Sequence, residues 1–344
     1  MLAALITGKE QTELREFPEP TPAPSGVVVD VAFCGICGTD IHAYQSGDPY
    51  NPAVCGHEWV GTVSAAGSAV SAIAEGDRVV VATPPACGHC NACRAGHPEV
   101  CETTFMFTVG RDPLAPPHGG FASSIAVSQG RVTAAQPDLS DEQAAQVEPA
   151  TITLHAVRKS RIRPGDAIVV QGAGPIGLLT MQFARAAGAG QLIVIEPNAE
   201  RRALAAELGA TATFAPGDNA QAAVRELSSG LGADLVFECA GRPELIQTAV
   251  SLARRGGSVT LVGLTHLPAT IIPALWMINE ISFQAALGYT HEEFDMAMGL
   301  IADGRVRVEP LHTLTVGLDG FDGVMAELAS ETTSHSKVLV DPRL

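Results

Sequence analysis

Short apolar runs separated by glycine, proline and polar turns recur through residues 1–150. Clear examples are the valine-rich segments Val27–Ala32, Val60–Ala65 and Arg78–Ala82. Runs of this kind, bounded by turn residues, are typical of antiparallel strands. The first part of the chain is therefore expected to form a β-rich domain built as a distorted barrel.

A different rhythm runs from about Asp166 to Leu287, because apolar runs there alternate with Ala/Leu-rich stretches of helical periodicity such as Gly177–Ala187 and Ala199–Leu208. The expected strands are Ala167–Gln171, Gln191–Ile195, Ala212–Phe214, Leu235–Glu238, Ser258–Val262 and Ser282–Ala286. Six strands with crossover helices predict a parallel, doubly wound sheet of the Rossmann type.

The alternation stops near residue 288, and the last apolar run, Lys337–Val340, is expected to return to the first domain. The predicted fold class is therefore α/β. A six-stranded Rossmann domain of residues 151–287 is inserted in a β-rich domain made of residues 1–150 and 288–344.

Composition and charge limit the partners and the cellular compartment to be expected. No segment approaches the roughly 20 apolar residues that cross a bilayer, and the first residues lack the features of a signal peptide, so we expect no membrane partner. The net charge of −16 is the opposite of a basic nucleic-acid footprint, so no nucleic-acid partner is expected either. Eight cysteines, half of them in one metal-binding run, suit a reducing compartment, and we expect the protein in the cytoplasm.

Four cysteines form a C-x2-C-x2-C-x7-C run, namely Cys87, Cys90, Cys93 and Cys101. Thiolates at these spacings converge on one tetrahedral zinc ion, and four sulfur ligands leave no position for substrate. The run therefore predicts a structural zinc site. An iron–sulfur cluster is the alternative, but the last gap is longer than in the usual cluster run.

The segment GAGPIG follows the expected strand that ends at Gln171 and precedes an expected helix. Gly172 would permit the tight turn, Gly174 the approach of a pyrophosphate, and Gly177 the close packing of helix on strand. Glu196 ends the next strand, where a carboxylate binds the adenosine ribose and disfavours a 2′-phosphate, so NAD is expected rather than NADP. The alternative is that these glycines only allow packing.

A second group of ligand types lies in CGICGTDIH, residues 34–42, and CGHE, residues 55–58. A catalytic zinc uses fewer protein ligands than a structural one, because it keeps a position for water or substrate. Spacing does not choose between Cys34, Cys37 and Cys55. A redox pair at Cys34 and Cys37 and a core histidine at His57 are the alternatives.

Seven segments occur in order along the chain: GICGTDIH, GHEWVG, GDRV, the four-cysteine run, VEPATITLHAV, GAGPIG and HSKVLV. With them the chain resembles the zinc-dependent medium-chain alcohol dehydrogenase family over essentially its whole length. Within that family it is most similar to the sorbitol and 2,3-butanediol dehydrogenase branch. The resemblance implies a GroES-like catalytic domain with both zinc sites and an NAD-binding Rossmann domain.

The resemblance also implies roles for single residues. It places the catalytic zinc on Cys37 and His57, with Glu58 as a ligand that can exchange with water and Glu148 at the remaining family position. Thr39 resembles the hydroxyl residue that takes the alcohol proton, and His42 the histidine that passes it to solvent. The implied cofactor-binding residues are Gly172, Gly174, Pro175, Ile176, Gly177, Glu196, Arg201 and Lys337. Ile176 would press on the nicotinamide and Lys337 would lie near the pyrophosphate.

Together these features predict reversible oxidation of a secondary alcohol or vicinal diol to the ketone, with two zinc ions per chain and NAD. A homodimer or homotetramer is expected, since an apolar edge at Ser282–Ala286 invites pairing with a second copy. A zinc-free quinone or enoyl reductase of the same fold, and a non-catalytic zinc and nucleotide binding protein, are the alternatives. Apolar residues of the loop Thr103–His118 line a substrate pocket or pack as core or dimer contact.

Overall fold

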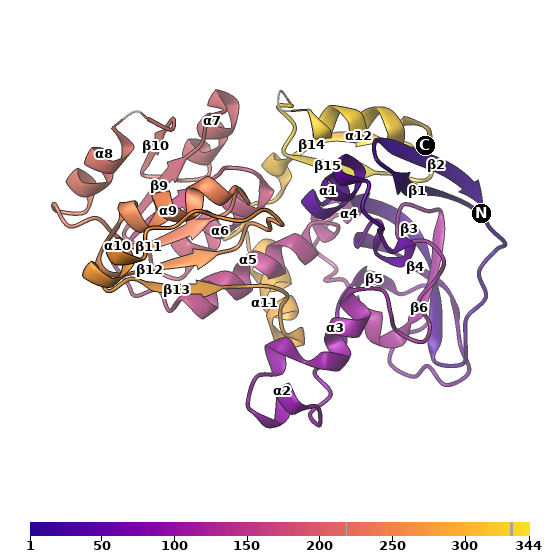
Figure 1. The fold of residues 1–344 in the computed structure, drawn as a ribbon. Coiled ribbons are helices and arrows are strands. Elements are labelled where there is room, and N and C mark those ends of the chain that lie inside the picture. The colour runs from indigo at the N-terminus through magenta and orange to yellow at the C-terminus, as the bar shows by residue number, and fades with distance from the viewer. Residues whose placement is uncertain (218, 331–332) are drawn as a thin grey trace. The chain divides into compact units, whose positions relative to one another are not determined.

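The computed structural model describes residues 1–217, 219–330 and 333–344, and it divides the chain into two compact units (Figure 1). The first unit comprises Met1–Glu148, Tyr289–Ala302 and Leu311–Leu344, and the second comprises Pro149–Gly288 and Asp303–Pro310. The expected division at residues 150 and 288 lies within two residues of this one, except for Asp303–Pro310. That segment belongs to the second unit because the Gln182 side chain bonds the backbone N–H and carbonyl of Arg307, at 2.8 and 3.0 Å.

A seven-stranded sheet is the centre of the first unit, with the order β14-β15-β3-β4-β5-β7 and with β6 paired to β3. Its strands are β3 (Gly26–Gly35), β4 (Glu58–Ala66), β5 (Arg78–Val81), β6 (Ser124–Ser128), β7 (Val132–Ala134), β14 (His312–Val316) and β15 (Lys337–Val340). All of its pairings are antiparallel except β14 with β15. The return of the chain's last strand to this sheet is confirmed.

The hairpin of β1 (Leu2–Gly8) and β2 (Gln11–Glu16) accompanies this sheet. Valines of β3 and β4 pack with Trp59, Phe121 and Phe321 in one buried cluster, because nearly every position of β3 is covered on both faces. The helices are α1 (Gly38–Ser46), α2 (Asn91–Arg94), α3 (Glu102–Thr108), α4 (Asp141–Ala144), α11 (His291–Ala302) and α12 (Phe321–Ala329). Five short 3-10 turns also occur, η1 (Pro52–Val54), η2 (Pro98–Val100), η3 (Gln129–Arg131), η4 (Glu309–Leu311) and η5 (Leu318–Gly320). Helix α5 (Val147–Ser160) crosses the boundary between the units.

The second unit contains a six-stranded parallel sheet of order β10-β9-β8-β11-β12-β13. Its strands are β8 (Ala167–Gln171), β9 (Gln191–Ile195), β10 (Ala212–Phe214), β11 (Ala233–Glu238), β12 (Ala253–Leu261) and β13 (Ser282–Ala285). The order reverses between β8 and β11, as in a doubly wound Rossmann sheet. The expected strands are thus found, and β12 begins earlier than expected because Ala253 already pairs with Ala233, ahead of an irregularity in the register.

Helices connect these parallel strands and cover the sheet (Figure 1). They are α6 (Pro175–Ala186), α7 (Ala199–Glu207), α8 (Ala220–Leu227), α9 (Pro243–Leu252) and α10 (Pro273–Ile278). Apolar residues of β8, β9, β11 and β12 form a buried cluster with α8 and α9. Among the described residues, no helix has the length and apolar character needed to span a bilayer.

Candidate active site

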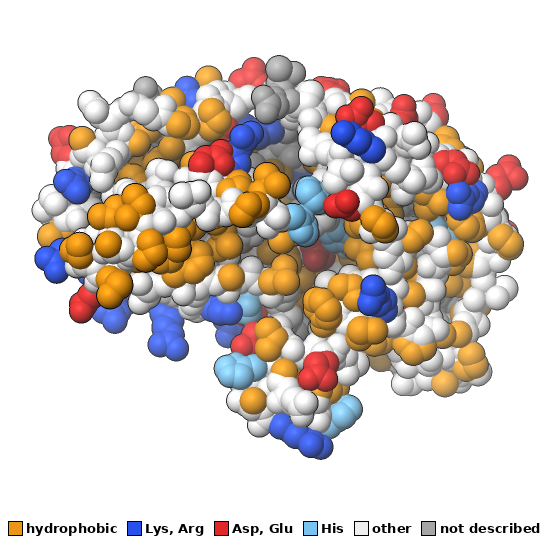
Figure 2. Space-filling view, viewed as in Figure 1, with side chains coloured by type: hydrophobic (Ala, Val, Ile, Leu, Met, Phe, Trp, Pro, Cys, Tyr) orange, Lys and Arg blue, Asp and Glu red, His pale blue; other side chains and the backbone are white. Residues whose placement is uncertain are grey.

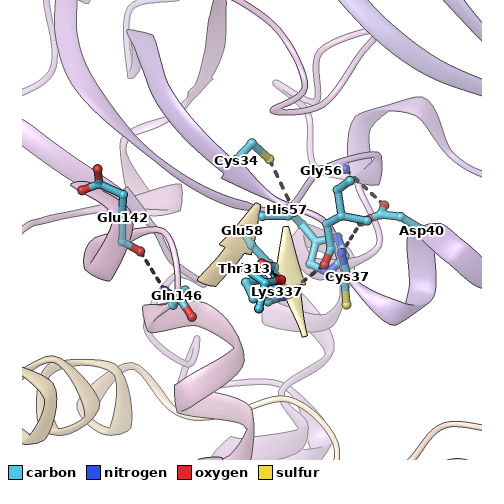
Figure 3. A network of polar contacts seen from close by, with 12 residues as sticks. Cys34, Cys37, Asp40, Gly56, His57, Glu58, Glu142, Gln146, Thr313 and Lys337 are labelled. Carbon is cyan, nitrogen blue, oxygen red and sulfur yellow. Dashed lines mark hydrogen bonds and ion pairs between the residues drawn. The ribbon is translucent and has the colours of Figure 1, made fainter. Parts of the chain in front are cut away.

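Three ligand-type side chains converge where β3 and β4 lie side by side (Figure 3). Antiparallel pairing places Gly35 opposite Glu58, so the turn into α1 lies beside the first residue of β4. The ligand atoms of Cys37, His57 and Glu58 all lie within 4.8 Å of one another. Sulfur, imidazole and carboxylate at this spacing are a donor set that suits zinc.

The structure distinguishes Cys37 from Cys34 and Cys55, the other two cysteines that the sequence spacing left as possible zinc ligands. Cys34 and Cys55 are completely buried, and their thiols point to the carbonyls of Gly35 and Ala4, at 3.8 and 3.9 Å. Burial raises the pKa of both thiols well above the usual range. They therefore pack in the core as neutral thiols, and a redox pair of Cys34 with Cys37 has no support.

Hydrogen bonds hold the backbone around the two candidate ligands Cys37 and His57. His57 Nδ1 lies 3.0 Å from the Val54 carbonyl, which leaves Nε2 for a metal. The buried Asp40 carboxylate accepts from the backbone N–H of Cys37 at 2.9 Å and of Gly56 at 3.2 Å (Figure 3). Burial would lower the pKa of His57, but Cys37, Asp40 and Glu148 raise it well above its usual value.

Glu58 forms a buried ion pair that the sequence did not indicate. Its Oε2 lies 2.6 Å from Lys337 Nζ, which also donates to the Ile36 carbonyl at 3.0 Å (Figure 3). The two side chains are 1% and 3% exposed. The pairing adds a contact that the sequence did not predict for Lys337, whose ammonium group is enclosed against Glu58, and its place near a pyrophosphate stays a prediction. A Cβ at position 35 would overlap Glu58 Oε2, so a larger residue there would displace the paired carboxylate.

Glu148 lies near this group without belonging to it, since the close set of ligand atoms is Cys37, His57 and Glu58. Burial raises the pKa of Glu148 to about 7, with opposing effects from His57 and a further rise from Glu58. Lys337, Arg131 and Tyr289 are further charged or polar neighbours of Glu148, and the last two were missed by the sequence analysis. No spacing signal links positions so far apart in the chain.

Thr39 and His42 lie on the first turns of α1, directly after Cys37. The Thr39 hydroxyl oxygen is covered and has no hydrogen-bond partner among the described residues. His42 is three positions later and exposed, so both residues lie along one side of the helix. The unpaired hydroxyl leaves a donor and an acceptor for a ligand.

The four cysteines of the predicted zinc knuckle also converge. The sulfurs of Cys87, Cys90, Cys93 and Cys101 all lie within 4.8 Å of one another. Backbone N–H groups point at two of them, from Cys90 to Cys87 Sγ and from Cys87 to Cys101 Sγ, each at 3.3 Å. Burial opposes it, but the N–H groups of Cys87 and Thr104 lower the pKa of Cys101 to about 5, whereas burial and the neighbouring thiols raise the pKa of Cys93 to about 12. A low thiol pKa favours the thiolate form that binds metal.

The structure narrows the roles that the sequence left open for the loop after this knuckle, residues 103–118. Phe105 and Met106 lie on α3 and are 54% and 41% exposed, so they are not core residues. Asn51 donates to the carbonyls of Val109 and Gly110, each at 2.8 Å, which ties the loop to η1. The Arg131 guanidinium donates to the Phe107 carbonyl as well.

The glycine-rich segment forms a tight turn between β8 and α6. Gly172 has φ +94°, and Pro175 occupies the first turn of the helix. A Cβ at Gly177 would overlap the Gly172 carbonyl oxygen, whereas a Cβ at Gly174 would meet nothing within 4 Å. The free backbone at Gly174 and the amino-terminal end of α6 suit the binding of a phosphate group.

Glu196 directly follows β9, as expected, and joins two turns. Its carboxylate accepts from the backbone N–H of Ala173 at 2.7 Å and of Asn198 at 2.9 Å. Asn198 caps α7, and Arg201 lies in the first turn of that helix. Each carboxylate oxygen has a second lone pair, so Glu196 retains acceptors for ribose hydroxyls.

Family models match two stretches of the chain. The alcohol dehydrogenase GroES-like domain matches residues 23–137, and the zinc-binding dehydrogenase domain matches residues 175–303. Probable D-xylulose reductase A from Neosartorya fischeri is 32% identical over 324 residues, which cover 91% of this chain and 89% of that protein. Sorbitol dehydrogenase from Bacillus subtilis is 30% identical and covers 99% and 97% of the two chains.

Solved structures give the same result. The 2R,3R-butanediol dehydrogenase of Bacillus subtilis superposes with a TM-score of 0.84 at 31% identity, over 99% of each chain. A putative zinc-binding dehydrogenase of Sinorhizobium meliloti bound to NADP gives 0.85 at 32%, also over 99% of each. An Escherichia coli alcohol dehydrogenase complexed with NADH gives 0.86 at 26% over 99% of each. The chain belongs to the zinc-dependent medium-chain alcohol dehydrogenase family, which confirms the expected fold and enzyme class.

Proposed function

We propose that this chain oxidises a secondary alcohol or vicinal diol reversibly to the ketone, with NAD as hydride acceptor and two zinc ions per chain. The convergence of Cys37, His57 and Glu58 carries the proposal. Three protein ligands leave one tetrahedral position open, as a catalytic zinc requires. Zinc held there supplies Lewis acidity, which lowers the pKa of an alcohol. Of the two carboxylates, the interatomic distances favour Glu58 as the ligand over Glu148.

Thr39 and His42 are proposed as the proton path. A buried hydroxyl with no partner is costly unless a ligand pairs with it, so Thr39 Oγ1 suits contact with the substrate hydroxyl. Thr39 would accept that proton while its own hydroxyl proton moves to a ribose hydroxyl of the bound cofactor, and His42, three positions on along α1, would take the relayed proton and release it to solvent. Imidazole suits this step because its ordinary pKa is about 6.5.

The second unit is proposed as the NAD-binding domain, with the pyrophosphate at the Gly172–Gly177 turn and the ribose at Glu196. Ile176 would pack against the nicotinamide, which accepts the hydride. A carboxylate at Glu196 repels a 2′-phosphate, which favours NAD even though one structural relative is bound to NADP. Arg201 is proposed beside the adenine. Lys337 is kept in this set as the basic residue near the pyrophosphate, with its charge also paired to Glu58.

The four-cysteine knuckle is proposed as the structural zinc site, since its sulfurs fill all four positions. All eight cysteines are free thiols, which supports a cytoplasmic location. Relatives named for sorbitol, xylulose and butanediol favour a polyol or diol substrate here. A zinc-free quinone or enoyl reductase is disfavoured, because it should lack both ligand clusters.

A substrate panel with two Thr39 variants tests this function. Vicinal diols, polyols and simple secondary alcohols are offered with NAD and with NADP, and NADH absorbance is followed. We expect activity with NAD and a diol or polyol. Thr39→Val should lower kcat by about 100-fold at unchanged zinc content, whereas Thr39→Ser should retain activity because it keeps the hydroxyl. Full turnover by Thr39→Val, or by protein stripped of the open-site metal, contradicts the proposal.

A further inference from the structure

A tyrosine hydroxyl lies behind the candidate metal centre, at the loop between α1 and η1. Tyr50 Oη lies 2.8 Å from Asp40 Oδ1 and 3.3 Å from the Val54 carbonyl. Asp40 is completely buried, while Tyr50 is half-buried. The sequence spacing of the ligand-type residues predicts neither the Tyr50–Asp40 contact nor the Tyr50–Val54 contact.

The Asp40 carboxylate and the Val54 carbonyl are each hydrogen-bonded to the backbone or side chain of a candidate zinc ligand. Asp40 accepts from the backbone N–H of Cys37 and of Gly56, the residue before His57, at 2.9 and 3.2 Å (Figure 3). The Val54 carbonyl lies 3.0 Å from His57 Nδ1 and thereby orients the imidazole. The Tyr50 hydroxyl thus contacts the hydrogen-bond partner of each of the two candidate ligands, Cys37 and His57.

Burial and the charge of Asp40 keep the Tyr50 hydroxyl protonated, so that it acts as a hydrogen-bond donor. Burial, and next the Asp40 carboxylate, raise the pKa of Tyr50 far above its usual value. The phenol therefore stays protonated and gives Asp40 a third hydrogen bond besides the two backbone N–H groups. Without it, one oxygen of a buried carboxylate would lose a donor, and such a group tends to shift to recover one.

We propose that Tyr50 is a positioning residue of the metal centre, which acts through Asp40 and Val54 on Cys37 and His57. The inference rests on the proposed open zinc site. Residues that hold the ligands of a metal set its affinity and geometry, and their loss costs about 10- to 100-fold in metal affinity. Tyr50 touches those holding groups rather than the ligands, so its effect belongs at the lower end of that range.

The test compares Tyr50→Phe with Tyr44→Phe. Tyr44 is a buried ring of α1 in the same hydrophobic cluster, and it matches the loss of one hydroxyl. Zn²⁺ affinity of the open site is measured by chelator competition on the full chain with the knuckle zinc in place. The visible spectrum of protein with Co²⁺ in the open site reports ligand geometry, and thermal unfolding reports stability.

Tyr50→Phe should weaken Zn²⁺ binding about tenfold and alter the Co²⁺ spectrum, with wild-type values for Tyr44→Phe. In an Asp40→Asn background, Tyr50→Phe should have a smaller effect, because the two act as one unit. Equal affinity and an unchanged spectrum for Tyr50→Phe would overturn the inference, even if its unfolding temperature falls. Wild-type protein that binds zinc only at the knuckle would instead remove the proposed function and this inference with it.

Discussion

Glu58 and Lys337 show how far a residue's identity predicts its contacts. Both were singled out by the sequence, but for different ligands, and they lie 279 positions apart. Strand register brings them together, because β15 pairs with β3 at Leu339 and Gly35 while Gly35 is opposite Glu58. The sequence motifs identified Glu58 and Lys337 as candidate functional residues. Only the pairing of the strands shows that their side chains contact each other.

Glu238 gives a pH-dependent prediction at the residue scale. It ends β11 in full burial, and its carboxylate accepts from the N–H groups of Ala240 at 2.9 Å and Gly241 at 3.2 Å. Burial raises its pKa to about 7 despite these bonds. The folded state therefore binds this proton more tightly than the unfolded state. The resulting stability is fully present below pH 4.5 and is lost as pH rises to about 7.

Glu238→Gln should flatten that dependence. Between the two pKa values the loss amounts to roughly 3 kcal/mol in the free energy of unfolding. Urea unfolding of the wild type and the variant at several pH values measures the difference in slope. Glu226→Gln, at an exposed position of α8, is the control and should keep the wild-type slope. Parallel curves for Glu238→Gln and wild type would refute the assignment.

At the scale of elements, the strand–turn–helix unit of β8 and α6 assigns different tasks to its glycines. Gly177 is required by packing, because its Cβ would overlap the Gly172 carbonyl. Gly174 has open space beside its Cα and φ −70°, a backbone angle that any residue adopts. If a pyrophosphate lies against it, the space is needed only when the cofactor is bound.

Two alanine variants separate these tasks. Gly177→Ala should lower the unfolding temperature and also weaken NAD binding. Gly174→Ala should leave the unfolding temperature unchanged while the KM for NAD rises about tenfold, because the added methyl obstructs only the cofactor. Thermal unfolding without cofactor and steady-state kinetics provide the two readouts. Normal NAD kinetics in Gly174→Ala would contradict the placement of the pyrophosphate.

Regular elements were the most predictable part of this chain. The strands β8 and β9 begin and end close to where apolar runs begin and end, because parallel strands covered on both faces are almost continuously apolar. The ligand types at Cys37 and His57 were also readable from residue chemistry, together with the resemblance. The hydrogen bonds of Asp40 and Tyr50 were not. They depend on how a loop folds back on a helix end, which no periodicity records.

For the whole molecule, β13 presents an edge of the second unit's sheet. Apolar side chains around it and α10 are exposed, as the orange patch over these elements in Figure 2 shows: Ile271, Ile272, Leu275, Met277, Ile278, Phe283 and Leu287. A patch of this kind beside an edge strand favours pairing with a second copy. We propose a homodimer through this edge as the basic assembly, from which a tetramer can be built.

Charge placed on the edge should break this assembly. Phe283→Lys should shift the protein to monomer in light scattering after size exclusion, because a lysine on an edge strand opposes strand pairing. Leu14→Lys, on the exposed β2 of the first unit, is the control and should leave the assembly intact. Wild-type protein that is already monomeric would count against the edge as an interface.

The central claim is an open zinc site on Cys37, His57 and Glu58, distinct from the closed knuckle. Elemental analysis of zinc per chain, in wild type, His57→Ala and Cys93→Ser, tests it most directly. Two ions are expected in the wild type and one in each variant, with alcohol-dependent NADH formation abolished in His57→Ala. Wild-type protein with a single zinc ion, or His57→Ala with two and full activity, would contradict the account.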